Sequence, residues 1–228
     1  MSYTKKVFED NIIKNVQQIV STTVERNNIM PLVDIIDSTF EILEGIKKFD
    51  LEIGEFWNEI TSDIIASINS ATSGFYRQGI ITLRSVLELG CMSLFYYDHR
   101  VEFHLFKEHD AIADKYVSKL IREYNFFTTK YINAFCKNIR EIENKEDSVS
   151  NYLGTTYKKL SDIVHGRYKT LTKKETLKIE YSQEYFSDFI KHLNSVLSIL
   201  ATMYILRFGD KTNLKIVELA NKSRTVAL

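Results

Sequence analysis

Apolar residues recur every three to four positions along most of the chain, which is the spacing that predicts amphipathic α-helices. We predict helices over residues 3–27, 31–49, 55–73, 75–97, 101–122, 124–143, 152–165 and 182–207, with a last short helix beyond residue 210. Segment 75–97 is the most apolar of these, so we expect it to be buried on several sides at the centre of the fold. The pattern therefore predicts an all-α helical bundle of about seven to nine helices.

Residues that start or stop helices divide this pattern. Pro31 suits the first turn of a helix, and Ser182 suits the N-cap position. The polar run 144–151 predicts a linker, and the alternation over 177–181 is compatible with a short strand. We expect an N-terminal helical extension (1–50), a helical bundle (51–210), and a short C-terminal helix and tail (211–228).

Composition supports the helical interpretation. Glycine and proline together make up nine of 228 residues, about 4% of the chain, against a usual share of roughly 12%. A β-sandwich or barrel needs many turns of the kind that these residues form, so those folds are excluded. Cys91 and Cys136 lie in apolar sequence, which is typical of a reduced intracellular protein.

Localisation and assembly are expectations of the sequence as well. The start of the chain lacks the apolar core of a signal peptide, and the longest apolar stretch, 196–206, is too short to cross a bilayer. We therefore expect a cytoplasmic protein that does not enter a membrane. We also expect a homodimer, because aromatic residues are enriched at interfaces and cluster in mid-chain as Tyr96, Tyr97, Phe103, Phe106, Phe126 and Phe127.

Charge is balanced overall but concentrated in one segment. Residues 158–178 carry seven basic and two acidic side chains, a net charge of +5 in a chain whose formal net charge is zero. Such a segment attracts phosphate backbones, although a solvated loop without a partner would have the same composition. Its candidate nucleic-acid-binding residues are Lys158, Arg167, Lys169, Lys173 and Lys174.

Two groups of polar residues stand out against the helical pattern. In the most apolar helix, Arg84 and Glu88 are four residues apart, on the same side as Cys91. They form either an ion pair that fixes packing or a polar pocket that positions a phosphate. Near the basic segment, Tyr157, Ser161 and His165 share one helix face. His165 at the helix end is either an acid–base group or a capping residue.

Taken together, Arg84-Ser-Val-Leu-Glu88 and Tyr157-Lys-Lys-Leu-Ser161-Asp-Ile-Val-His165-Gly166 resemble the divergent HEPN-like helical domains of bacteria. The resemblance covers residues 60–207. It implies an all-α bundle that usually dimerises, and many members of that family are metal-independent ribonucleases of toxin–antitoxin and antiphage systems. Their active site is an R-x(4–6)-H motif contributed by both subunits. We therefore expect no cofactor and no metal.

This sequence departs from that motif, because Lys158, Lys159 and Leu160 occupy the positions of the arginine. The resemblance implies His165 as general acid or base, with Ser161, Lys159, Arg84 and Glu88 as further candidate catalytic residues that orient or stabilise the phosphate. Two functions stay open. One is a HEPN-like endoribonuclease or RNA-binding defence component. The other is a non-catalytic scaffold or sensor subunit that binds a partner protein of a defence or regulatory complex.

Overall fold

The structure, a computed structural model, describes residues 4–109, 116–137, 140, 145–165 and 179–228. In this part of the chain it is helical and contains no β-strand, so the predicted all-α class is confirmed. The elements run in the order α1 (Lys5–Phe8), a π-helical turn η1 (Glu9–Lys14), α2 (Asn15–Arg26), α3 (Met30–Phe49), α4 (Leu51–Thr72), α5 (Tyr76–Asp98), α6 (Arg100–His109), α7 (Val117–Tyr124), α8 (Thr129–Asn133), α9 (Ser148–Val164), α11 (Gln183–Phe208) and α12 (Leu214–Asn221).

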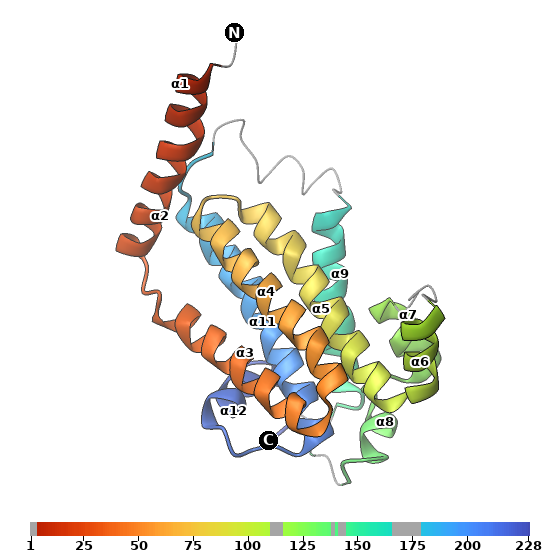
Figure 1. Ribbon diagram of the computed structural model, residues 1–228. Helices are drawn as coiled ribbons and strands as arrows, with labels where there is room; N and C mark the ends of the chain where they lie inside the picture. Colours follow the sequence, from red (N-terminus) through yellow and green to blue (C-terminus); the bar gives the residue numbers. More distant parts are fainter. Residues whose placement is uncertain (1–3, 110–115, 138–139, 141–144, 166–178) are drawn as a thin grey trace.

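Helices α4, α5 and α11 form the centre of the bundle, and α9 lies beside α5 (Figure 1). The predicted central segment is α5, whose apolar side chains are buried along its whole length. Trp57 of α4 is fully buried, and its indole nitrogen donates a hydrogen bond to Ser93 Oγ of α5 at 3.0 Å. Burial of these faces is the main stabilising contribution to the fold.

The turn between α4 and α5 depends on two glycines. Gly74 has a φ of +87°, a backbone conformation that other residues rarely adopt. Gly79, in the first turn of α5, leaves no room for a side chain, because a Cβ atom there would be 2.9 Å from the Ser67 carbonyl oxygen. Ser67 Oγ donates to the Gly79 carbonyl at 2.8 Å, so a small residue lets the two backbones approach.

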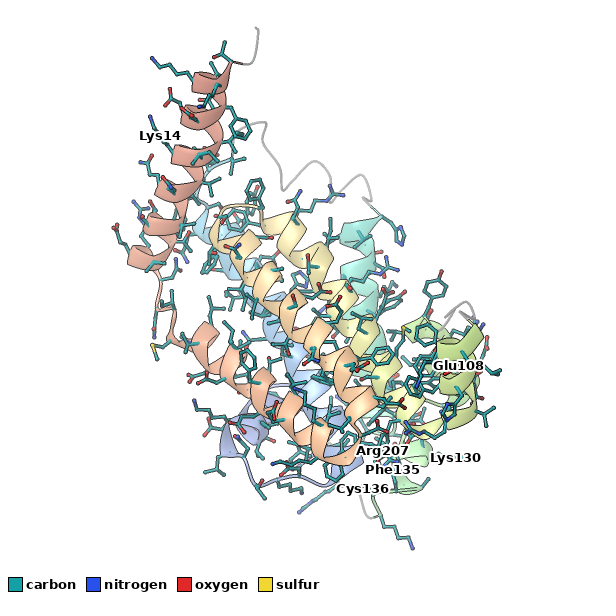
Figure 2. All side chains as sticks on the ribbon, in the orientation of Figure 1. Lys14, Glu108, Lys130, Phe135, Cys136 and Arg207 are labelled. Atoms are coloured by element: carbon teal, nitrogen blue, oxygen red, sulfur yellow. The ribbon has the colours of Figure 1, made fainter. Side chains whose placement is uncertain are left out.

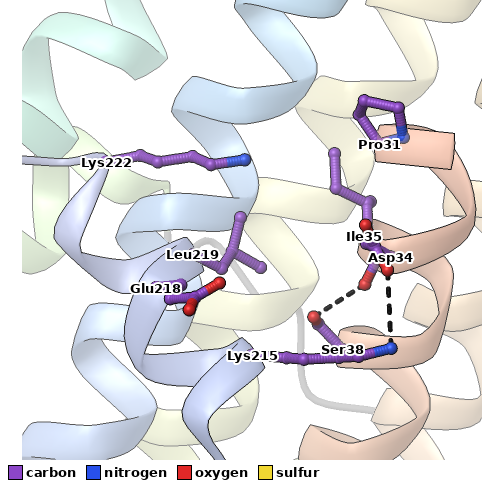
Figure 3. Close-up of a pocket in the computed structure, with 8 residues that line it drawn as sticks. All are labelled: Pro31, Asp34, Ile35, Ser38, Lys215, Glu218, Leu219 and Lys222. Atoms are coloured by element: carbon purple, nitrogen blue, oxygen red, sulfur yellow. Dashed lines mark hydrogen bonds and ion pairs between the residues drawn. The ribbon is translucent and has the colours of Figure 1, made fainter. Parts of the chain in front are cut away.

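Helices α3 and α12 cover one end of this core. The buried face of α3 includes Leu32, Ile35 and Ile46, and it packs against α4 and α12. Lys215 of α12 forms ion pairs with Asp34 at 3.4 Å and with Asp37 at 3.1 Å. Figure 3 shows the Lys215–Asp34 pair across the groove between the two helices. The predicted boundary at residue 50 thus falls between two helices that pack on each other.

The segment from α1 to α2 forms an arm that stands away from the bundle, with Lys14 on its outer part (Figures 1 and 2). The predicted helix over 3–27 is present, interrupted by the π-helical turn η1. The buried residues of α2 are Ile19 and Thr23. Thr23 Oγ1 donates a hydrogen bond to the Thr72 carbonyl of α4 at 3.1 Å. The arm is therefore attached through its C-terminal half.

The mid-chain differs from the prediction. In place of two long helices over 101–122 and 124–143, the described residues form the shorter α6, α7 and α8. Asn125 ends α7 in the left-handed conformation at φ 52°, which stops the helix. Helix α9 begins at Ser148, so the predicted linker is shorter than 144–151. The possible strand over 177–181 lies partly outside the described residues, and its described part, 179–181, is not a strand.

The mid-chain aromatic residues are core residues for the most part. Tyr96, Phe103, Phe126 and Phe127 are each at most 3% exposed. Their rings contact one another and neighbouring rings inside the bundle. Their enrichment therefore does not support the homodimer expected from the sequence.

A polar cluster joins α5, α8 and α11. Asp98 accepts hydrogen bonds from Arg207 Nε at 2.7 Å and from the Tyr131 hydroxyl. The Arg207 guanidinium lies over the rings of Tyr97 and Phe135, 4.6 and 5.0 Å from their centroids. Figure 2 shows Arg207 next to Phe135. Burial, together with the neighbouring Asp98 carboxylate, raises the pKa of Tyr131, so its hydroxyl stays protonated.

By length and composition alone, α5 and α11 could each cross a membrane. Of their most apolar stretches, 61% and 72% respectively are buried inside the bundle, as is usual for the core helices of globular proteins. The finding is weak evidence on membrane association.

Candidate functional site

Arg84 and Glu88 form the predicted ion pair on the side of α5 that faces α9. Arg84 Nη2 and Nε each lie 3.2 Å from Glu88 Oε1, and the two side chains are 15% and 27% exposed. Burial alone would lower the pKa of Arg84, but the charge of Glu88 and the hydrogen bond to Tyr157 raise it above its ordinary value. The guanidinium therefore stays charged.

Helix α9 brings a second set of polar side chains to this pair. Tyr157, Ser161 and His165 are spaced at four residues and share one face of α9, as the sequence predicts. All three line the same cavity. Arg84 Nη2 donates to the Tyr157 hydroxyl at 3.2 Å, and the guanidinium carbon lies 5.3 Å from the centre of the Tyr157 ring. Tyr157 thus holds the arginine by a hydrogen bond and by a cation–π contact.

Arg84 and His165, 81 positions apart in the sequence, meet directly. Arg84 Nη1 lies 3.1 Å from His165 Nε2. A guanidinium can only donate hydrogen bonds, so the hydrogen bond forms with His165 Nε2 as the acceptor. The contact therefore presents a proton-accepting nitrogen directly beside a fixed positive charge.

His165 is the C-cap residue of α9, and its side chain is exposed. Its backbone N–H donates to the Ser161 carbonyl at 2.9 Å. The helix C-terminus is the negative end of the helix dipole and favours a cation there. An imidazole at this place can accept a proton, while its exposure leaves it accessible to a substrate.

Tyr157 is the site residue to which the sequence assigned no role. Burial raises the pKa of its phenol, as does the charge of Glu88, while the hydrogen bond from Arg84 lowers it; the net direction is upward. Its hydroxyl therefore stays protonated and polar but uncharged. The four-residue spacing to Ser161 was the signal in the sequence, and its contact with α5 needed the fold.

Ser161 also stands out. Its Oγ atom is buried and has no hydrogen-bond partner among the described residues. A buried hydroxyl without a partner is costly, so a structure usually satisfies it. Ser161 lines a cavity of about 430 Å³ next to His165, although its Oγ atom itself is closed to solvent.

The basic residues divide into two groups. Lys158 is exposed and lines this cavity, whereas Lys159 is exposed and is not part of its described lining. The side chains of neighbours in a helix point about 100° apart, so the two lysines leave α9 in different directions. The other candidate nucleic-acid-binding residues, Arg167, Lys169, Lys173 and Lys174, lie outside the described residues.

The described part of the chain contains no group of three metal-ligating side chains close enough to hold an ion. Both cysteines are free. Complete burial raises the pKa of the Cys91 thiol, and the charge of Glu88 raises it further. Cys91 therefore stays protonated and belongs to the core.

Comparisons of the chain with protein-family models, with curated proteins and with solved structures found no match. The chemistry that the site can support therefore follows from the geometry of Arg84, Glu88, Tyr157, Ser161 and His165.

Proposed function

We propose that this protein is a HEPN-like, metal-independent endoribonuclease. The observation that carries the proposal is the 3.1 Å contact between Arg84 Nη1 and His165 Nε2. In this contact Arg84 takes the place of the arginine that is missing from the sequence positions before His165. The pair combines a fixed cation for a phosphate with a neutral imidazole for a proton, and this combination suits phosphodiester cleavage without a metal.

In the proposed reaction His165 is the general base. Nε2 accepts the proton of a ribose 2′-hydroxyl, and the 2′-oxygen forms a bond to phosphorus as the bond to the 5′-oxygen breaks. The 5′-oxygen takes up a proton from water, and the hydroxide that remains takes the proton from the His165 imidazolium. The products are a 2′,3′-cyclic phosphate and a 5′-hydroxyl. Arg84 exchanges its contact with the imidazole for one with a non-bridging phosphate oxygen, where it stabilises the developing negative charge.

The other residues have supporting roles in this proposal. Glu88 and Tyr157 position Arg84, since each contacts its guanidinium at 3.2 Å. Ser161 offers an unpartnered hydroxyl to the substrate. Lys158 and Lys159, both exposed near the end of α9, add positive charge that attracts the RNA backbone. The resemblance extends the proposal to a role in toxin–antitoxin or antiphage defence in the cytoplasm.

Cleavage of RNA in the presence of a chelator tests this proposal. The purified protein should cleave a single-stranded RNA in EDTA and leave 2′,3′-cyclic phosphate ends, which mass spectrometry detects. An oligonucleotide that carries 2′-O-methyl groups should stay intact, because it lacks the attacking hydroxyl. Cleavage of the methylated strand, or an absolute need for a divalent ion, would contradict the mechanism.

A second candidate function is a non-catalytic scaffold or sensor subunit of a defence or regulatory complex. The network around Arg84 favours this function, because the guanidinium already donates hydrogen bonds to Glu88, Tyr157 and His165. In that case the cluster would hold α5 and α9 together. Substitutions in the cluster would then change stability, and the protein would cleave no RNA.

We also propose a homodimer, formed through the N-terminal arm. The arm exposes Phe8, Ile13 and Val24 by 48%, 46% and 46%, while its outer half stands away from the bundle. Sedimentation velocity at micromolar concentration should give a dimer. The double variant Phe8→Glu, Ile13→Glu should sediment as a folded monomer. A monomeric wild type would refute the dimer, and an unchanged dimer in the variant would exclude the arm as its interface.

A further inference from the structure

The cavity beside the Arg84–His165 pair lies between α7 and α9. It measures about 430 Å³, within the range of small-molecule sites. Its described lining consists of Ser118, Gly154, Tyr157, Lys158, Ser161, Asp162 and His165. All but Ser118 come from one stripe of α9, so a single helix face connects the cavity to the candidate catalytic histidine.

Gly154 is unusual within this stripe. It stands in the interior of α9, where glycine is less favourable than alanine. Close packing does not explain it, because a Cβ atom there would meet only Ile121 Cδ1, at 3.5 Å, among the described residues. Glycine in such a place is typical of backbone that a ligand approaches closely.

Ser161 gives the second observation. Ser161 lines the cavity, but its Oγ atom is closed to solvent and has no hydrogen-bond partner among the described residues. A change of the Ser161 χ1 rotamer would turn the hydroxyl toward the cavity, where a ligand that donates or accepts one hydrogen bond would satisfy it. Two turns of α9 therefore carry a backbone without a side chain at Gly154 and a hydroxyl without a described hydrogen-bond partner at Ser161.

We propose that this cavity binds the nucleoside of a nucleoside monophosphate unit whose phosphate lies at Arg84 and His165. The hydroxyl of Ser161 contacts the ribose or the base, and Lys158 lies at the rim beside the phosphate. This inference rests on the proposed function and gives it a binding subsite. The same chemistry occurs in one residue of an RNA chain and in a free mononucleotide.

Three variants test the site by binding. Gly154→Leu fills the cavity, and Thr155→Leu is its control, because Thr155 is exposed on α9 and is not part of the described lining. Ser161→Ala removes the hydroxyl without breaking a described hydrogen bond. Isothermal titration calorimetry with each of the four ribonucleoside 3′-monophosphates should show that Gly154→Leu weakens binding at least tenfold, that Ser161→Ala weakens it severalfold, and that Thr155→Leu stays within about twofold of wild type. Thermal unfolding of each variant confirms that it is folded.

A 2′-O-methylated dinucleotide distinguishes the two sources. Tighter binding of the dinucleotide than of the mononucleotide supports a subsite for RNA, and tighter binding of the mononucleotide supports a site for a free nucleotide. Equal binding by folded Gly154→Leu and wild type would overturn the inference, as would a wild type that binds neither probe. Failure of the proposed function looks different, since the wild type would then bind nucleotide in a Gly154-dependent way but cleave no RNA.

Discussion

Replacing His165 with alanine should lower the rate of RNA cleavage by about 10²–10⁴-fold, the usual contribution of a general base. The protein should stay folded, because the His165 side chain is exposed at the end of α9. Loss of its contact with the helix end costs on the order of 1 kcal/mol. The rate of cleavage and the melting temperature, measured side by side on the same preparation, check both parts of this expectation.

His104→Ala is the matched control, because His104 is also exposed and lies on α6, and it is not a residue of the candidate site. It should leave cleavage and stability unchanged. A His165→Ala protein that cleaves RNA as fast as wild type would remove His165 from the mechanism. A variant that loses stability while the wild type itself has no activity would favour the scaffold function instead.

Replacing Asp98 with alanine should cause the largest loss of stability. The substitution removes the acceptor of both Arg207 and Tyr131, and the Asp98 and Arg207 side chains are only 16% and 23% exposed. Loss of one partner of a largely buried pair costs about 3–5 kcal/mol, because the remaining charge keeps its desolvation penalty. We expect a melting temperature lower by roughly 6–20 °C. Urea unfolding monitored by circular dichroism measures the change.

Glu52→Ala is the control for this experiment. Glu52 pairs with Lys107, but the two side chains are 45% and 44% exposed. Water and salt screen such a pair, so its loss should barely move the unfolding midpoint. Equal effects of the two substitutions would mean that the Asp98 cluster does not stabilise the packing of α5, α8 and α11.

Local patterns in the sequence determined most of the helices. The spacing of apolar residues located α3, α5 and α11 within a few positions, because amphipathic periodicity is a property of each segment alone. Ser182 was identified as an N-cap from residue type, and its side chain accepts a hydrogen bond from the Tyr185 N–H. The same reasoning was weakest over 101–143, where short helices and a left-handed Asn125 interrupt the pattern.

Some parts of the candidate site were determined locally as well. The pairing of Arg84 with Glu88 followed from their four-residue spacing in an apolar helix. The shared face of Tyr157, Ser161 and His165 followed from the same rule. Both are contacts or alignments within a single helix, whose geometry fixes which side chains are neighbours.

Only the tertiary structure decided which helix faces meet. The contact of Arg84 with His165 joins residues 81 positions apart, and it exists because α5 packs against α9 in one particular rotation. That rotation also places Lys158 rather than Lys159 at the cavity and leaves the Ser161 hydroxyl buried without a partner. A helical period specifies the buried face of each helix, but the facing partner depends on side-chain packing across the whole core.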